Sequence, residues 1–280
     1  MGGNKMNETK SVKALKKQLA AAIAMVCVAA IALASSTYAW FVQSNQVTAT
    51  GMQVQAQAEG GIEISNSDRK TWSTTANATN TSSTSLYPTS TNNSLSAWYH
   101  AQAQGAGSKD AINNSYATLD LDDNGVGKGE DEFKGKQFYL VNSFFIRSTA
   151  GTSAKELAID KVTVTGNEEG KTVDLDKSLR VAVIAGANKY IFAPAGGQLS
   201  YNVWDGSSNN GPKTQVTATD GTQKQTTTVN DITTKGDTEV KIYVWYEGED
   251  TDHYSDHLAD TIDTLNVTVE FSATTGQAAA

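Results

Sequence analysis

Oxygen-bearing side chains recur at alternate positions in the segment that begins at Asp120. Asp120, Asp122 and Asn124 stand at positions 1, 3 and 5 of a stretch whose sixth residue is Gly125. This spacing is typical of a calcium-binding loop, because the three side chains can converge on one hard cation and glycine permits the sharp turn. The twelfth position, where such loops place a bidentate glutamate, holds Asp131. Calcium is therefore the one cofactor that the sequence indicates, and the alternative is an acidic turn that binds no ion.

A second acidic cluster lies between Asp250 and Asp260. It contains His253 and His257, which would share one face of a helix, as two zinc ligands must. The glutamate that follows the first histidine in zinc proteases is absent, so we interpret the cluster as a solvated acidic loop. Because the sequence also has no nucleophile-elbow Gly-x-Ser-x-Gly motif and no phosphate-binding loop, we predict that the protein is not an enzyme.

Three aromatic residues, Trp72, Trp98 and Tyr99, lie in or beside Ser-, Thr- and Asn-rich sequence. Aromatic rings on exposed loops can stack on sugar rings, which would make these residues glycan contacts. The alternative, which we prefer, is that the rings pack beneath the polar segments as a small satellite cluster.

The chain of 280 residues is acidic and has a single cysteine. It has 22 basic and 30 acidic side chains, and the part from residue 40 onward has 17 against 29. Such a surface disfavours nucleic-acid binding, which requires clustered lysine and arginine. The cysteine, Cys27, lies in the N-terminal apolar run, so the rest of the chain must be stabilised by burial and strand pairing without disulfides.

Residues 1–39 have the three parts of a secretory signal. A lysine-rich segment over 10–17 precedes an uninterrupted apolar run over 19–34, and small residues follow. Cleavage after Ala34 and cleavage after Ala39 both fit the pattern; the alternative is an uncleaved membrane anchor. The basic flank keeps this end in the cytoplasm, so we predict a secreted protein of the cell surface that meets the membrane only through this segment.

Alternation of apolar and polar residues dominates the rest of the chain. The segments that alternate, or that form short apolar runs, are 47–58, 62–64, 138–146, 157–164, 179–183, 240–246 and 265–271. Successive side chains on a β-strand point to opposite faces, so each segment predicts a strand. Many short strands with Gly-rich connections predict an all-β fold, a jelly-roll-like antiparallel β-sandwich preceded by an N-terminal signal helix.

Two polar tracts interrupt this pattern. Residues 65–96 contain 22 Ser, Thr or Asn out of 32, and residues 205–236 are similarly rich in Thr, Asn, Gly and Gln. Both are typical of long surface segments, and the apolar strands on either side of each tract belong to one core. We therefore predict a single domain over 40–280 with insertions at about 65–136 and 197–236.

Short motifs near both ends resemble those of the camelysin/TasA-type exported proteins. They are Thr37-Tyr-Ala-Trp-Phe41 at the signal boundary, the strand-like segment 45–54 with its central Gly51, and the ending 267–277. The run Trp245-Tyr-Glu247-Gly-Glu-Asp250 is similar to a Trp-x-Glu-Gly-x-Asp run in related clostridial exported proteins. The resemblance covers residues 15–65 and 238–277 and leaves the middle unmatched.

This resemblance implies a jelly-roll subunit of an extracellular, biofilm-matrix fibre that is processed by a dedicated signal peptidase. In such fibres the N-terminal segment of one subunit completes the sheet of the next, a head-to-tail contact that propagates a homopolymer. Residues 41–47 would be the donor strand here, with Phe41, Val42 and Val47 as its apolar positions. The alternatives are that 40–47 is a frayed strand start, and that the protein is a monomeric surface adhesin or carbohydrate-binding module.

Overall fold

The computed structural model describes residues 48–49, 53–59, 61–79, 86–101, 116–129, 133–148, 154–166, 177–204, 213–232, 236–250, 261–262 and 265–275. The predicted signal over 1–39 and the predicted donor residues Phe41, Val42 and Val47 lie outside this part. In the described part, no helix is long and apolar enough to cross a membrane.

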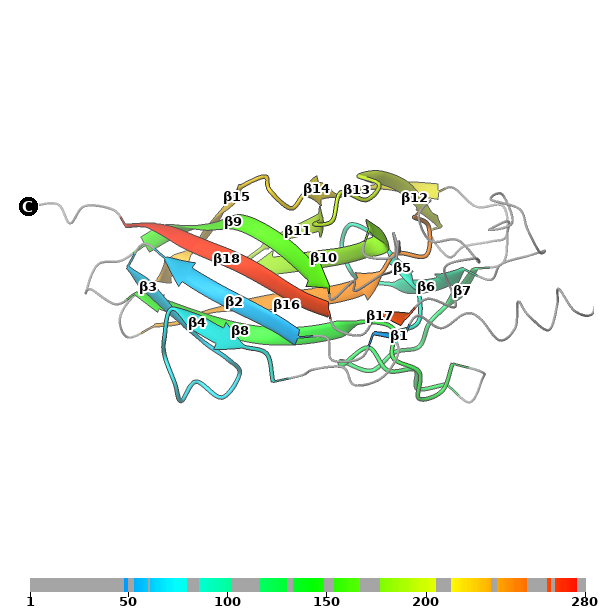
Figure 1. Ribbon diagram of the computed structural model, residues 1–280, viewed down its shortest axis with the longest axis horizontal. Coiled ribbons are helices and arrows are strands. Elements are labelled where there is room, and N and C mark those ends of the chain that lie inside the picture. Colours follow the sequence, from blue (N-terminus) through cyan, green and yellow to red (C-terminus); the bar gives the residue numbers. More distant parts are fainter. Residues whose placement is uncertain are drawn as a thin grey trace, which may run out of the picture. The chain divides into compact units, whose positions relative to one another are not determined.

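The described residues fold almost entirely into β-strands, which confirms the predicted all-β class (Figure 1). No α-helix occurs among them. The strands are β1 (Thr48–Ala49), β2 (Gln53–Glu59), β3 (Ile62–Ser65), β4 (Thr75–Asn77), β5 (Ser90–Thr91), β6 (Trp98–Ala101), β7 (Tyr116–Thr118), β8 (Leu140–Ser148), β9 (Ala154–Gly166), β10 (Leu179–Ala185), β11 (Asn188–Ala193), β12 (Ser200–Trp204), β13 (Lys213–Thr217), β14 (Thr219–Asp220), β15 (Gln225–Ile232), β16 (Thr238–Tyr246), β17 (Thr261–Ile262) and β18 (Leu265–Thr275).

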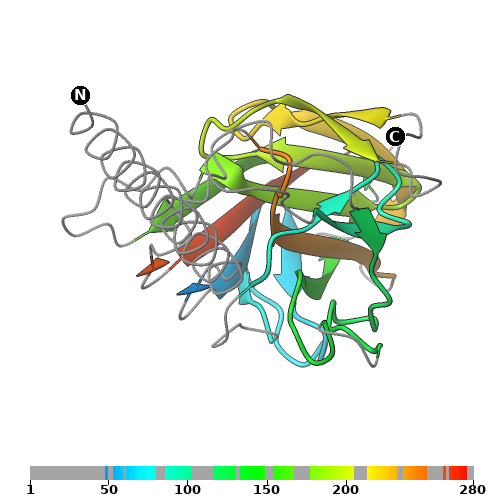
Figure 2. The same cartoon turned by 90° about the vertical axis from the view of Figure 1, so that its right-hand side faces the viewer.

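Two large sheets form a sandwich-like pair (Figures 1 and 2). One has five strands in the order β15-β9-β18-β2-β4, and the other has six in the order β14-β11-β10-β16-β8-β3. Most neighbouring pairs are antiparallel; β18 and β2, and β11 and β14, are parallel. Each sheet therefore has one face turned to the other sheet and one turned away from it.

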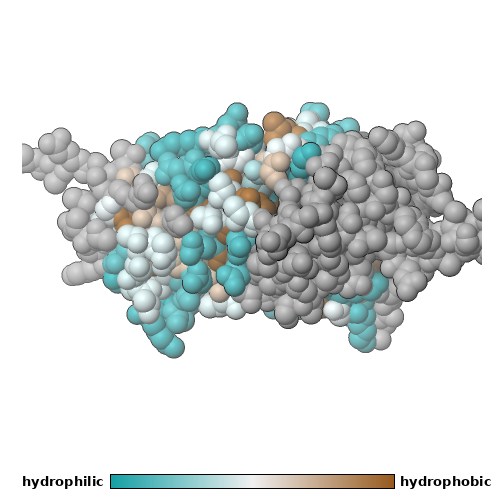
Figure 3. Space-filling view, in the orientation of Figure 1, coloured by the Kyte–Doolittle hydropathy of each residue, from teal (hydrophilic) through white to brown (hydrophobic). Residues whose placement is uncertain are grey.

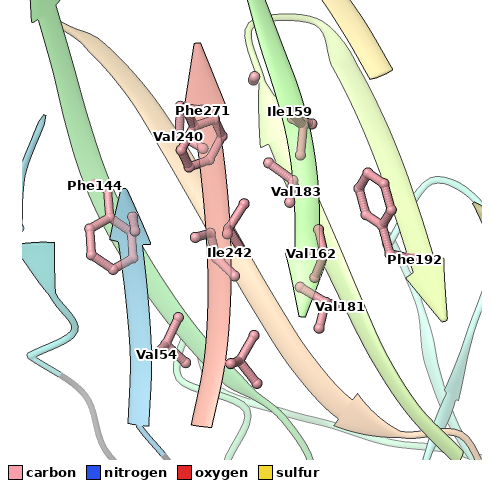
Figure 4. Close-up of a cluster of buried hydrophobic side chains, with 14 of the residues drawn as sticks. Val54, Phe144, Ile159, Val162, Val181, Val183, Phe192, Val240, Ile242 and Phe271 are labelled. Atoms are coloured by element: carbon pink, nitrogen blue, oxygen red, sulfur yellow. The ribbon is translucent and has the colours of Figure 1, made fainter. Parts of the chain in front are cut away.

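The inner faces of the two sheets share one hydrophobic core (Figure 4). On β16, Val240, Ile242 and Val244 are fully buried, while Glu239 just before them is exposed and Lys241 between the first two is half-buried. The same alternation brings Val54, Ile159, Val162, Phe144, Val181, Val183, Phe192 and Phe271 into this core. Burial of a large apolar side chain stabilises the fold by roughly 1.5–3 kcal/mol, so the alternation seen in the sequence determines which face of each strand points inward.

A β-bulge in β9 changes the phase of its alternation. Leu157 and Ile159 are buried, and the next buried residue is Val162 rather than residue 161. The pairing with β18 skips Asp160, because Lys161 lies opposite Glu270 and Ile159 lies opposite Phe271. The extra residue of a bulge returns the following side chains to the core face. Two short apolar patterns in the sequence are thus one continuous strand.

The first and last long strands lie side by side. β2 and β18 are parallel over seven register pairs, from Asn266 opposite Gln53 to Ser272 opposite Glu59. Ahead of them, β1 and β17 also pair in parallel. The outer face of this sheet carries Gln53, Gln55, Asn266 and Thr268, and its coloured residues in Figure 3 are mainly hydrophilic.

Parts of both predicted insertions belong to the sandwich itself. β4 pairs with β2 through Asn77 opposite Gln55, and β15 pairs with β9 through Thr226 opposite Ala158. Threonine is β-branched and suits a pleated surface, so a Thr-rich tract can be a strand as readily as a loop. Because both tracts have a low-complexity composition, the sequence did not predict these two edge strands.

The remaining inserted strands cover part of the outer face of the six-stranded sheet. β5, β6 and β7 form one small sheet, and β12 and β13 form a hairpin. Their side chains build a second hydrophobic cluster, in which Trp98, Tyr201 and Val216 pack with Ala182 and Trp245 of the large sheet. Trp245 lies between two inner-facing residues of β16, so its side chain is on the outer face of the sheet. It is nevertheless buried, because this layer lies over it.

Candidate functional site

The predicted calcium loop is a short hairpin turn. Leu121 forms an antiparallel bridge with Gly127, and the Asp122 side chain accepts the backbone N–H groups of Asn124 and Val126, both at 2.9 Å. The Asp120 carboxylate lies 3.3 Å from the Lys128 ammonium, with both side chains exposed. These contacts close the turn through the chain's own groups.

The structure thus brings three of the predicted calcium ligands onto one turn, and Asp131 lies outside the described residues. Across the ranges that the structure describes, no three His, Cys, Asp or Glu side chains are grouped so as to hold a metal ion. Calcium binding at this turn stays a prediction. Gly125 is required here for another reason: its φ is +86°, and a Cβ atom would lie 2.5 Å from the Tyr139 carbonyl oxygen.

The three aromatic residues predicted as glycan contacts have different surroundings. Trp98 and Tyr99 are buried, at 7% and 4% exposure, in the cluster beneath the inserted strands. Trp98 stacks on Tyr139 with a centroid separation of 4.3 Å. Trp72 is half-buried, and the Arg147 guanidinium lies 4.1 Å from the centre of its ring. A glycan contact at these rings stays a prediction. His253 and His257 lie outside the described residues.

A buried polar network forms at the end of β16, and sequence reasoning did not predict it. Its members include Trp245, Glu247 and Asp250, which are the named residues of the Trp-x-Glu-Gly-x-Asp run. Arg180 and Ser90 join them from distant parts of the chain, and all five residues are at most 1% exposed. The one sequence signal was an arginine inside the apolar run of 179–183.

The Arg180 guanidinium is the centre of one half of the network. It pairs with Asp250, and neither side chain is exposed. It also donates hydrogen bonds to the carbonyl oxygens of Lys177 at 2.8 Å, Leu179 at 2.9 Å and Gln198 at 2.7 Å. Gly197 makes room for this arrangement, because a Cβ atom there would lie 1.8 Å from the Lys177 oxygen. A buried charge that is paired and hydrogen-bonded in this way avoids most of the cost of desolvation.

The Glu247 carboxyl group is the centre of the other half. The Ser90 hydroxyl donates to one of its oxygens, and the Trp245 indole N–H donates to the other at 3.0 Å. The surrounding backbone is also paired, since the N–H of Glu247 donates to Ser178 and the N–H of Gly248 donates to Thr89. The network therefore ties the first insertion, the start of β10 and the end of β16 together.

Burial raises the pKa of both glutamates at this end of β16. It raises the pKa of Glu247, against the lowering effects of the Ser90 hydroxyl, the Trp245 N–H and the Arg180 charge. Burial also raises the pKa of Glu249 to about 8. Arg180 and Asp250 form the buried ion pair of the network. The chemistry of this site suits structural cohesion, because all five side chains are buried and paired with one another.

The protein is expected to become less stable as the pH rises from 5 to 9. A group whose pKa is higher in the folded state contributes its full stabilisation below its unfolded pKa, here near 4.5, and loses it as the pH rises through the folded value. For Glu249 that value is about 8. We expect a loss of about 1 kcal/mol or more, or ~2–4 °C in melting temperature. Thermal melts of the wild type and of Glu249→Gln would test this, and an equally steep pH dependence in the variant would contradict it.

Comparisons with protein-family models, with curated proteins and with solved structures find no match for this chain. Function therefore has to be inferred from the chain's own residues.

Proposed function

We propose that the protein is a secreted structural subunit of an extracellular, biofilm-matrix fibre, a jelly-roll sandwich whose copies join head to tail through an N-terminal donor strand. The donor is the segment 41–47, with Phe41 and Val42 as its anchors. The signal peptidase cleaves the chain and so frees this segment. Each subunit then binds a second copy of the same protein. The protein acts outside the cell and catalyses no reaction.

One observation carries the proposal: the five-stranded sheet has an edge that another strand can extend. β4 pairs with β2 on one side. On its other side, in the described part of the chain, the one bridge lies ahead of the strand, where Ser73 pairs with Ile64 of β3. Thr75 and Asn77 are exposed, while Ala76 between them is half-buried. An edge strand with free backbone groups is a template for a strand from another chain.

The backbone of β4 has a definite inner and outer side. The Ala58 N–H donates to the Thr74 carbonyl, and the Ala78 N–H donates to the Val54 carbonyl. Because backbone groups alternate in direction along an antiparallel pair, those of residues 74, 76 and 78 face β2. The N–H and C=O groups of Thr75 and Asn77 therefore point away from the sheet, toward an incoming strand.

The opposite edge of the five-stranded sheet, formed by β15, is less accessible to an incoming strand. On β15, the Thr226 carbonyl accepts a hydrogen bond from the Tyr190 hydroxyl at 2.9 Å, and the Thr227 hydroxyl accepts one from Asn188. β15 also carries an irregularity in register between Thr228 and Ile232. Side chains and bulges of this kind protect an edge from pairing, so β4 is the edge that we assign to the donor.

The direct test removes residues 40–47 from the purified exported protein and compares the two forms by electron microscopy. We expect fibres from the complete form and none from the truncated one. Fibres that form equally well without the segment would overturn the donor-strand mechanism.

Proline substitutions on β4 test the acceptor edge. Thr75→Pro removes an outward N–H and leaves the pairing with β2 intact, so it should abolish fibres while the melting temperature changes little. Ala76→Pro is the matched control, because it removes an inward N–H and should destabilise the sheet. Normal fibres from a folded Thr75→Pro protein would exclude β4 as the acceptor.

A further inference from the structure

A groove of about 480 Å³ lies on the outer face of the six-stranded sheet. Its lining includes Ile184, Gly186, Asp237, Glu239, Lys241 and Tyr243, most of them from β10 and β16. The layer of inserted strands covers Trp245, whereas Glu239 near the other end of β16 is exposed. The groove thus begins where the covering layer ends, and we name it the β16 groove. Its volume falls within the range of about 300–1,000 Å³ that is usual for ligand sites.

Tyr243 forms one end of the β16 groove and is held rigidly. Its ring centre lies 5.4 Å from that of Tyr139 and 6.4 Å from that of Trp98. The side chain is half-buried, because one part packs on the second hydrophobic cluster and another part lines the groove. An aromatic ring fixed by its neighbours loses little conformational entropy when a ligand contacts it.

The charged groups of the β16 groove are balanced within the protein. Lys241 Nζ lies 3.9 Å from the Glu239 carboxylate, which also accepts a hydrogen bond from the Ser143 hydroxyl at 2.8 Å. The Asp237 carboxylate lies 3.5 Å from the Arg69 guanidinium. Paired in this way, the groups present donors and acceptors whose opposite charges largely offset one another. An ionic ligand would gain little, whereas a neutral ligand with many hydroxyl groups could use donors and acceptors alike.

We infer that the β16 groove binds a neutral glycan chain, with Tyr243 against the C–H face of a sugar ring and Glu239 and Lys241 hydrogen-bonded to its hydroxyl groups. A peptide ligand fits less well, because peptides are usually anchored by apolar side chains in apolar pockets. The groove has two half-buried apolar side chains, Ile184 and Tyr243, and its other side chains are polar or charged, so it is not an apolar pocket of that kind. This activity is independent of fibre assembly and would add adhesion to matrix polysaccharide.

Calorimetric titration of the purified protein with neutral hexasaccharides tests the inference. The probes are cellohexaose, maltohexaose and N-acetylated chitohexaose, and polylysine and polygalacturonate are the charged comparisons. We expect saturable binding of at least one neutral probe, weakened about tenfold or more in Glu239→Ala and in Lys241→Met. Glu270→Gln, on the outer face of the other sheet, is the matched control and should bind as the wild type does.

Tyr243 requires two variants because it also packs in the fold. Tyr243→Phe keeps the ring and should retain most of the binding, while Tyr243→Ala should abolish it; the melting temperature of each shows whether the protein is folded. Absence of binding to every neutral probe would overturn the inference. It would also be overturned by binding only to the charged polymers, or by neutral-glycan binding that Glu239→Ala and Lys241→Met leave unchanged.

Discussion

Replacing Asp250 with alanine is expected to lower the free energy of unfolding by about 3–5 kcal/mol. The substitution leaves the Arg180 guanidinium without its carboxylate in a position where neither side chain is exposed. The Gln198 N–H, which donates to the same carboxylate oxygen at 3.2 Å, loses its acceptor too. Chemical denaturation of wild type and variant, followed by tryptophan fluorescence, measures the difference.

An exposed ion pair provides the matched control for Asp250. Asp120 pairs with Lys128, with side chains 73% and 55% exposed, and Asp120→Ala should therefore cost no more than about 1 kcal/mol. If the two aspartate substitutions destabilise the protein equally, the network at the end of β16 does not hold the insertions to the sandwich in the way the contacts indicate.

A chain that ends at residue 264 is expected not to fold. It lacks β18, which pairs with β9 on one side and with β2 on the other. It also lacks Val267, Val269 and Phe271, all fully buried in the shared core. Loss of a central strand leaves β2 and β4 with no neighbour to connect them to the sheet. Circular dichroism and limited proteolysis of the shortened chain provide the measurement.

The control for this truncation is a chain that ends at Thr275, which keeps all of β18 and removes only residues 276–280. It should melt as the full chain does. A cooperative melt from the chain that ends at residue 264 would show that the other strands are sufficient for the fold.

The strands with apolar alternation could be predicted from the sequence, because their burial follows from local pattern. Val240, Ile242 and Val244 on β16, and Val267 and Val269 on β18, point to the core as their spacing predicts. The bulge at Asp160 could not be predicted in this way. A bulge is a property of a pair of strands, and its partner β18 lies more than 100 residues further along the chain.

The network at the end of β16 was beyond sequence reasoning for a related reason. The Ser90 hydroxyl and the Glu247 carboxylate that it contacts are 157 residues apart, and Arg180 and Asp250 are 70 apart. Nothing in the local sequence of Arg180 indicates a buried partner, and lone arginines on strands are usually exposed. The sequence did not predict the β16 groove for the same reason, because the groove exists only where the inserted strands stop covering the outer face of the six-stranded sheet.

Because β2 and β18 are neighbours in the sheet, the sheet can form only after both strands have been synthesised. β2 leaves the ribosome early, and its parallel neighbour is made of residues 265–275, which follow β2 by more than 200 residues. Strands that are far apart in the sequence pair slowly, because a long loop must close before they come into contact. A chain interrupted before that point lacks the central strand of the five-stranded sheet. Synthesis through β18 is thus a precondition for a stable five-stranded sheet.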